Sequence, residues 1–331
     1  MRQAGRIFPE FRALRERYDF VQLMQHPDLC AEITVMPVER LGVDAAILFA
    51  DIMTPLHPLG VGYRIEPGVG PVVDRPLRDR NDLRRLRRFD PREELEPVLA
   101  TVRLVRRALA GRVPLIGFAG APFTLACYLI EGRPSREFTR ARALMYADPA
   151  FWHELMDLLT GTVLAYLQAQ VEAGVQAVQL FDSWVGGLGP AEYREDVLPY
   201  SRRIFAGLEG AGVPRIHFGT GTAALLPLMA EAGPDVVGVD WRVELDRAWA
   251  AIGPGLAIQG NLDPAVLLAP FDRVRERALD VLRRAAGRPG HIFNLGHGVL
   301  PDTPVDHLRR LVELVHEASA RSAAGVTPGP E

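Results

Sequence analysis

Two features near the start of the sequence have the residue types and spacing to do chemistry. Residues 45–50 are six consecutive apolar residues, and Asp51 follows them directly. An apolar run without polar alternation predicts a strand buried on both faces, so Asp51 stands where burial ends. Arg2 and Arg6 lie four apart in MRQAGR. Arginine forks suit the binding of carboxylates, although this spacing is also common on solvated helices.

Polar or glycine-rich residues also end six further predicted strands. They are Gly120, Ser183 after Asp182, Gly219, Asp240, Asn261, and His297 after Gly296. One such residue alone is more often a cap or a turn former. The recurrence at seven strand ends favours a shared mouth, because the carboxyl ends of parallel strands converge there.

The elements that carry these residues alternate between strand and helix. Helix starts have an Asp or Thr followed by Pro, as at Asp90, Asp148, Asp263 and Thr303. This alternation predicts a parallel α/β fold with right-handed crossovers. Seven strands without a GxGxxG motif fit a distorted (β/α)8 TIM barrel better than a doubly wound sheet, with the missing first strand expected before Met1.

The pattern also predicts the limits of the domain. Residues 1–317 are expected to form a single barrel domain, and residues 54–71, rich in Pro and Gly, a long loop. Residues 318–331 consist mainly of small residues, Gly and Pro without an apolar face, so we expect a disordered tail.

Composition excludes several classes of function. The net charge of −3 argues against a nucleic-acid or membrane-surface binder, and no apolar run approaches the roughly 18 residues of a membrane span. All 38 Lys+Arg positions are arginine, so a Schiff-base, pyridoxal-phosphate or P-loop lysine is excluded. The two cysteines, Cys30 and Cys127, lie far apart, which makes a disulfide framework improbable and a cytoplasmic setting the default.

A set of longer motifs carries a resemblance to a known family. They are MRQAGR followed by PEFR, FADI, GFAGAPFTLACYLIEG, QLFDSW, VGVDWR, QGNLDP and NLGHGVLPDTP. In this order and at these intervals, the chain up to about residue 317 resembles the uroporphyrinogen decarboxylase family. The resemblance implies a distorted (β/α)8 barrel that works as a homodimer. It also implies an enzyme that removes carboxyl groups from the four acetate side chains of uroporphyrinogen III, giving coproporphyrinogen III without a cofactor or metal.

The same resemblance implies which residues form the site. The RQAGR segment, which is Arg2, Gln3, Ala4, Gly5 and Arg6, would line the cleft, with both arginines near substrate carboxylates. Asp51 would face the pyrrole nitrogens. Tyr128, Ser183 and His297 would complete the substrate contacts.

The residue types agree with this role on chemical grounds. A pyrrole acetate loses CO2 only when the ring can accept electrons, and protonation of a ring carbon provides that electron sink. A buried carboxylate such as Asp51 stabilises the positive charge that then grows on the ring NH groups. The proton donor stays open among Arg2, Tyr128, His297 and a bound water.

Two alternatives stay open, one a related enzyme and the other a binding protein. A corrinoid-linked methyltransferase of the same superfamily would need thiolate and imidazole ligands converging on zinc, and the sequence has no His-x-Cys pairing. A catalytically silent tetrapyrrole-binding barrel would keep the arginines and lose Asp51, which is present.

Overall fold

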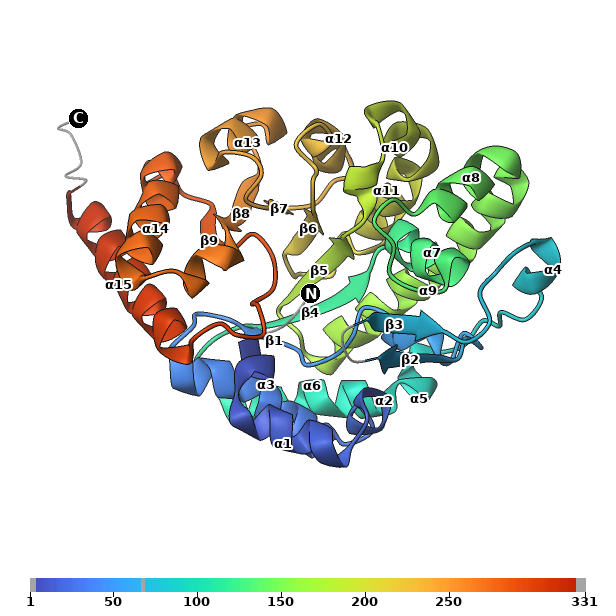
Figure 1. The fold of residues 1–331 in the computed structure, drawn as a ribbon, viewed down its shortest axis with the longest axis horizontal. Helices are drawn as coiled ribbons and strands as arrows, with labels where there is room; N and C mark the ends of the chain where they lie inside the picture. The colour runs from blue at the N-terminus through green and yellow to red at the C-terminus, as the bar shows by residue number, and fades with distance from the viewer. Residues whose placement is uncertain (1–3, 67–68, 326–331) are drawn as a thin grey trace.

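The seven predicted strands form one parallel sheet in the computed structural model, which describes residues 4–66 and 69–325. The strands, in sheet order, are β1 (Ala46–Ile47), β4 (Leu115–Gly120), β5 (Ala177–Asp182), β6 (Arg215–Gly219), β7 (Val236–Gly238), β8 (Ala257–Leu262) and β9 (His291–Leu295). The sheet curls into a half-barrel with helices outside it (Figure 1). Within the described ranges, β1 and β9 are its two edges and do not pair with each other. The parallel α/β prediction is therefore confirmed.

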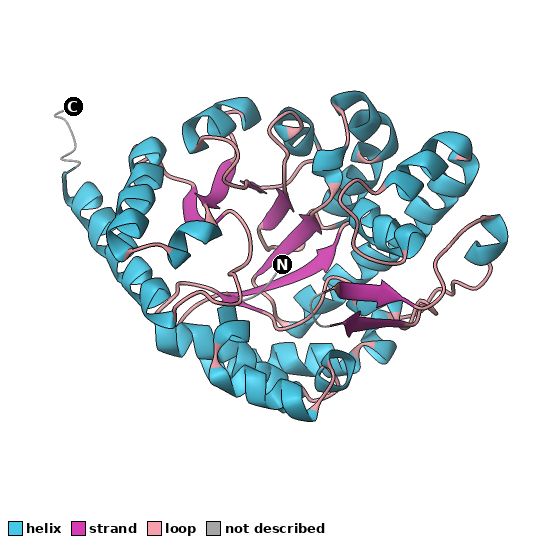
Figure 2. Ribbon diagram, in the orientation of Figure 1, coloured by secondary structure: helices cyan, strands magenta, loops and turns pink. Residues whose placement is uncertain are grey.

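The register brings the polar strand ends to one edge of the sheet. Gly120 at the end of β4 lies opposite Phe181 on β5, and Asp182, the next residue, lies opposite Gly219 on β6. Because every pairing in this sheet is parallel, all carboxyl ends point the same way (Figure 2). The residues singled out by sequence at these ends therefore share one rim.

The outer layer consists of helices, of which α1 to α3 precede β1 and the others come after it in the chain. Their bounds are α1 (Pro9–Arg17), α2 (Phe20–Leu23), α3 (Pro27–Leu41), α4 (Arg80–Leu83), α5 (Pro91–Glu94), α6 (Glu96–Leu109), α7 (Pro122–Glu131), α8 (Thr139–Ala147), α9 (Pro149–Ala173), α10 (Pro190–Asp196), α11 (Leu198–Gly207), α12 (Leu226–Glu231), α13 (Leu245–Ile252), α14 (Phe271–Ala285) and α15 (Val305–Gly325). Short 3-10 helices are η1 (Ala4–Ile7), η2 (Thr54–Leu56), η3 (Val185–Gly187) and η4 (Pro264–Leu268). None of the helices in the described ranges combines the length and apolarity needed to cross a membrane.

Three of the four predicted helix starts, those at Asp90, Asp148 and Asp263, have side-chain caps. Asp148 accepts a hydrogen bond from the Phe151 amide, and Asp263 accepts one from the Ala265 amide. The helix predicted from Asp90 onward is divided into α5 and α6 at Leu95. Pro97 lies just after this break, and its lack of an N–H prevents the regular helical bond back to residue 93.

Helix α15 covers the outside of the seam between β9 and β1. It packs against α14 on one side and α3 on the other (Figure 1). His316 on α15 pairs with Asp44, which precedes β1, at 2.9 Å. The last helix thus ties the two edges of the half-barrel together.

The structure changes the predicted tail boundary. Sequence alone predicted disorder from Ala318, whereas α15 continues to Gly325. The Ala-rich segment has high helix propensity and extends a helix that is already formed, which explains the difference. Residues 326–331 lie outside the described residues, and the single-domain boundary at residue 317 stays a prediction.

Two local predictions near β1 are wrong. The run 45–50 is not buried on both faces, because Ile47 is 36% exposed. Among the residues that the structure describes, β1 pairs only with β4 and is an edge strand. The predicted loop 54–71 contains η2, the strand β2 (Tyr63–Glu66) and the start of β3 (Gly70–Val73), which pairs with β2 in a hairpin.

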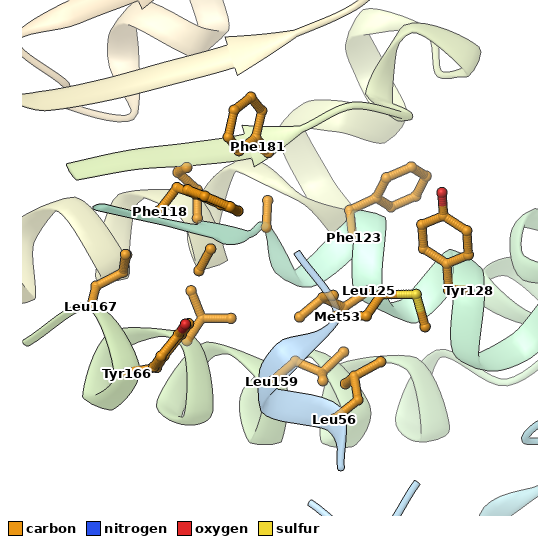
Figure 3. Packing of buried hydrophobic residues seen from close by; sticks show 14 of the residues in the cluster. Met53, Leu56, Phe118, Phe123, Leu125, Tyr128, Leu159, Tyr166, Leu167 and Phe181 are labelled. Carbon is orange, nitrogen blue, oxygen red and sulfur yellow. The ribbon is translucent and has the colours of Figure 1, made fainter. Parts of the chain in front are cut away.

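The core lies between the sheet and its helices. Figure 3 shows Leu159, Tyr166 and Leu167 of α9 pointing toward β4, where Phe118 lies. A second buried cluster surrounds β7 to β9. The strand ends are therefore held by packed elements on both sides of the rim.

Candidate active site

Asp51 is fixed at the end of the β1 segment by local hydrogen bonds. Its Oδ1 accepts from the Met53 amide at 3.0 Å, and its own amide donates to Thr54 Oγ1 at 3.1 Å. The residue is half-buried at the start of the turn into η2. This arrangement orients the carboxylate while leaving part of it accessible.

The RQAGR motif lies beside Asp51 as far as it is described. Arg6 Nη2 donates to the Ala50 carbonyl at 3.2 Å, and its guanidinium carbon lies 4.7 Å from the ring centroid of Phe20 and 5.3 Å from that of Phe49. A Cβ on Gly5 would lie 2.7 Å from the Ile33 carbonyl oxygen, so glycine is needed for this approach to α3. Ala4 begins η1.

Arg2 and Gln3, the other two predicted residues of this motif, lie outside the described residues. Their predicted contacts with substrate carboxylates therefore stay predictions.

Three buried tyrosines lie within electrostatic reach of Asp51. They are Tyr63 on β2, Tyr128 on α7 and Tyr166 on α9. Burial raises the pKa of each phenol, and the negative charge of Asp51 raises it further. Only Tyr128 was predicted as a site residue; Tyr166 had the periodicity of an ordinary inward helix position, and Tyr63 lay in the supposed loop.

Ser183 and Tyr128 belong to adjacent parts of the rim. The Tyr128 ring lies 5.9 Å from the ring of Trp184, the residue after Ser183, in an edge-to-face arrangement. Ser183 is 6% exposed, and its carbonyl accepts a hydrogen bond from Thr220 Oγ1 at 2.6 Å. The ends of β4, β5 and β6 are thus linked to one another.

His297 lies on the other side of the rim, after β9. Burial lowers the pKa of its imidazole to about 4, and the positive charge of Arg242 contributes in the same direction. Gly296, just before it, lies against the backbone of the segment after β7. Within the described residues, the structure shows no direct contact between His297 and the group around Asp51.

Gly296 is required by this close approach. A Cβ at this position would lie 2.6 Å from the Trp241 backbone nitrogen and 3.0 Å from Asp240 backbone carbons. We expect Gly296→Ala to lower the free energy of unfolding by about 1–3 kcal/mol, because backbone atoms must move apart. Denaturant titration measures this loss. Gly255→Ala is the matched control, since nothing lies within 4 Å of its Cβ; an equal loss in both variants would contradict the argument.

A buried ionisable pair lies just beneath Ser183. Asp182 and His217 are both 0% exposed, and Asp182 Oδ2 lies 3.5 Å from His217 Nε2. Thr124 Oγ1 donates to Asp182 Oδ1 at 3.3 Å. Burial raises the pKa of Asp182, although His217 and Thr124 lower it. His217 was missed at the sequence level because it lies within an apolar strand and not at its end.

The donor set for a thiolate metal site is weak. Cys30 and Cys127 are both buried, burial raises the pKa of the Cys30 thiol to about 12, and that of Cys127 is also raised. Both changes disfavour the thiolate that zinc would require. Among the residues that the structure describes, no group of three or more His, Cys, Asp or Glu side chains converges on a metal position.

Comparison with known proteins gives strong sequence matches. The chain is 54% identical over 325 residues to "Uroporphyrinogen decarboxylase" of Roseiflexus sp. (strain RS-1), covering 97% of this chain and 93% of that protein. It is 56% identical over 321 residues to the protein of that name from Streptomyces coelicolor, covering 97% and 90%.

A solved structure supports the fold. A "methyltransferase from Methanosarcina mazei" aligns with a TM-score of 0.76 at 19% identity, covering 92% of this chain and 90% of that one. At this identity the likeness concerns the fold alone.

The family model described as uroporphyrinogen decarboxylase (URO-D) matches residues 1–318. Together with the relatives at 54% and 56% identity, this match shows that the chain belongs to the uroporphyrinogen decarboxylase family.

Proposed function

We propose that this protein decarboxylates the four acetate side chains of uroporphyrinogen III to give coproporphyrinogen III and CO2, in porphyrin and heme biosynthesis. Membership of the family supports the reaction. The observation that carries the mechanism is the oriented carboxylate of Asp51, which is held by the Met53 amide beside Arg6 and the tyrosines. No cofactor is required, because the pyrrole ring itself accepts the electrons.

The proposed reaction begins with protonation of the pyrrole α carbon next to the ring carbon that bears the acetate. The ring becomes a cation, and its NH groups donate to Asp51, whose negative charge stabilises the cation without reorganisation. The bond to the carboxylate then breaks, CO2 leaves, and the bonding electrons neutralise the ring. A second proton converts the exocyclic methylene to a methyl group while the ring carbon loses its proton, so one proton is consumed overall.

Arg6 is proposed to bind the reacting carboxylate. It lies on the Ala50 carbonyl and over two aromatic rings, and this fixes the guanidinium next to Asp51. Arg2, Gln3, Ala4 and Gly5 are proposed to line the same cleft. Ser183 is proposed to contact the substrate from the end of β5.

The structure bears on the choice of proton donor. The raised pKa of Tyr128 makes its phenol a weak acid, and the lowered pKa of His297 leaves its imidazole neutral near pH 7. We therefore propose that both residues act as hydrogen-bonding partners of the substrate. Arg2 or a bound water then remains as the source of the proton.

The behaviour of His297 on titration tests this assignment. The folded-state pKa of about 4 lies below the usual value of about 6.5, so His297 stays neutral as the pH falls through 6.5 and is protonated near pH 4. Between about pH 6.5 and pH 4 the unfolded chain binds a proton at His297 and the folded protein does not. The stability that the neutral imidazole contributes is therefore lost as the pH falls through this interval. NMR titration of the His297 ring proton, assigned with a His297→Asn variant, measures the midpoint. A midpoint near 6.5 would show an imidazole able to serve as the acid.

The activity itself is tested by anaerobic incubation with uroporphyrinogen III, followed by oxidation and separation of the porphyrins by carboxyl number. We expect the tetracarboxylate to appear through partially decarboxylated intermediates. Tight binding of the substrate without conversion would indicate the silent tetrapyrrole-binding barrel instead. The corrinoid-linked methyltransferase is not favoured, because both cysteines are buried with raised thiol pKa values.

The family resemblance also supports a homodimer located in the cytoplasm. Sedimentation equilibrium measures the mass in solution, and a monomer at micromolar concentration would contradict the proposed assembly. Fractionation of cells tests the location, and recovery of the protein outside the cytoplasmic fraction would contradict it.

A further inference from the structure

One exposed arginine at the rim has no role in the mechanism above. Arg242 lies in the segment after β7, and 52% of its side chain is exposed. Its guanidinium carbon lies 4.3 Å from the ring centroid of Trp241, and Nη1 donates a hydrogen bond to Asp240 Oδ2. The guanidinium is therefore held on two sides although it remains accessible.

Asp240 holds Arg242 in a fixed position relative to the sheet. Asp240 is 1% exposed, and its Oδ2 also accepts from the Gly221 amide after β6, at 2.7 Å. Its backbone carbonyl accepts from Asn261 on β8 at 3.2 Å. Because Asp240 is anchored to neighbouring strands, Arg242 loses little freedom on binding a ligand, which favours affinity.

Arg242 lies close to His297 at the carboxyl ends of the strands. Gly296 packs against the Asp240–Trp241 backbone, and the charge of Arg242 acts on the neighbouring His297. Arg6 lies at the end of β1, beyond the seam between β9 and β1. Arg6 and Arg242 thus lie near strand ends on the two sides of this seam, an arrangement that suits a ligand with carboxylates around its whole edge.

The remaining donors of Arg242 match a carboxylate. A guanidinium has five N–H groups in a planar fork. Within residues 4–66 and 69–325, Nη2 and Nε of Arg242 have no hydrogen-bond acceptor, and Nη1 is used by Asp240. Since Asp240 already offsets part of the positive charge, binding would depend on paired hydrogen bonds more than on long-range attraction.

We propose that Arg242 binds a carboxylate of the porphyrinogen that is not reacting in that step, either a propionate or a waiting acetate. This inference rests on the proposed function. It makes Arg242 a residue for substrate affinity and orientation, separate from the groups that act on the reacting acetate.

Kinetics of Arg242→Gln test the proposal. We expect KM for uroporphyrinogen III to rise about 10-fold with kcat within about twofold, because a charged hydrogen bond common to ground and transition states is lost. Arg242→Lys should recover only part of the affinity, since an ammonium group lacks the fork. An unchanged KM, or a loss confined to kcat, would overturn the proposal.

Arg247→Gln is the matched control. Arg247 on α13 pairs with Glu244 and its side chain is 78% exposed, so its replacement should leave KM unchanged. A purely structural role of Arg242 would lower the melting temperature without raising KM selectively. An equal rise of KM in both arginine variants would indicate a nonspecific effect of charge and overturn the inference.

Two further readouts separate the outcomes. If Arg242 binds a propionate, the rise in KM should be the same for the octacarboxylate and the pentacarboxylate substrates. If it binds a waiting acetate, the rise should be smaller for the pentacarboxylate.

Titration with uroporphyrin III, which is not decarboxylated, measures Kd without turnover. A wild-type protein that binds uroporphyrin but never converts the substrate would contradict the proposed function. A Kd raised about 10-fold in Arg242→Gln would still support this inference, and an unchanged Kd would overturn it.

Discussion

Replacing Asp51 by Asn is expected to lower kcat for uroporphyrinogen III by about 10²- to 10³-fold, with a much smaller change in KM. The amide keeps the size of the side chain and an oxygen that can accept from the Met53 amide, which now donates to Asp51 Oδ1 at 3.0 Å. It removes the negative charge that stabilises the cationic ring. Since that charge matters most after protonation, the loss should appear in kcat.

A carboxylate just before the same strand provides the control. Asp44 precedes β1, is 84% exposed in its side chain and pairs with His316 on α15. Asp44→Asn should leave kcat unchanged and cost at most about 1 kcal/mol of stability, as for other surface ion pairs. A kcat for Asp51→Asn within about threefold of the wild-type value would remove Asp51 from the mechanism. The arginines would then be the better candidates for the groups that act on the substrate.

The strands were predictable because the signals for buried parallel strands are local. Each is a short apolar run that stops abruptly at a polar or glycine residue, and all seven runs are strands of the sheet. The exposure of Ile47 was not predictable in this way. Which strand lies at an edge depends on the pairing of distant segments, and in the described part of the chain β1 pairs with β4 on one side alone.

The hairpin β2–β3 shows a second limit of local reasoning. Its Pro and Gly content predicts a loop, but tertiary contacts stabilise the strands. The Val73 amide donates to the Gly132 carbonyl at 2.8 Å, and the Leu77 amide donates to the Leu129 carbonyl at 2.8 Å. These partners lie more than 50 residues away, so a short window of sequence cannot reveal them.

The residues of the candidate site also differ in how far the sequence alone could predict them. Asp51 and the residues at strand ends could be picked out from sequence position, whereas the roles of Tyr128, Ser183 and His297 came from the family resemblance. Tyr166 and His217 gave no such signal, because each occupies a position that any buried side chain could fill. Their polar atoms can be assigned a role only when the fold shows which carboxylate lies near them.

The buried pair of Asp182 and His217 gives the largest expected effect on stability. Losing the imidazole leaves the buried carboxylate of Asp182 uncompensated, so His217→Leu should lower the free energy of unfolding by about 3–5 kcal/mol near pH 8. Few alternative partners are close: Thr124 donates to Asp182 Oδ1, and the nearby Cys127 and Tyr193 are also buried. Denaturant titration measures the loss.

The pH dependence of this loss follows from the pKa of Asp182. Burial already raises the folded-state pKa above the unfolded value, and losing His217 should raise it further. An acid with a raised folded-state pKa favours folding most below its unfolded pKa, and that contribution is lost as the pH rises through the folded pKa. The deficit of His217→Leu relative to wild type should therefore be smaller near pH 5 than near pH 8.

A double variant separates charge from packing. Asp182→Asn combined with His217→Leu removes the charge along with its partner, so it should recover much of the stability lost in His217→Leu and show a weaker pH dependence. If the loss in His217→Leu came only from the volume change against Phe205, whose ring lies 5.1 Å from the imidazole, the double variant would be no more stable and the deficit would be equal at both pH values. Because Asp182 immediately precedes Ser183, this comparison also tests whether the end of β5 is held by electrostatics or by packing alone.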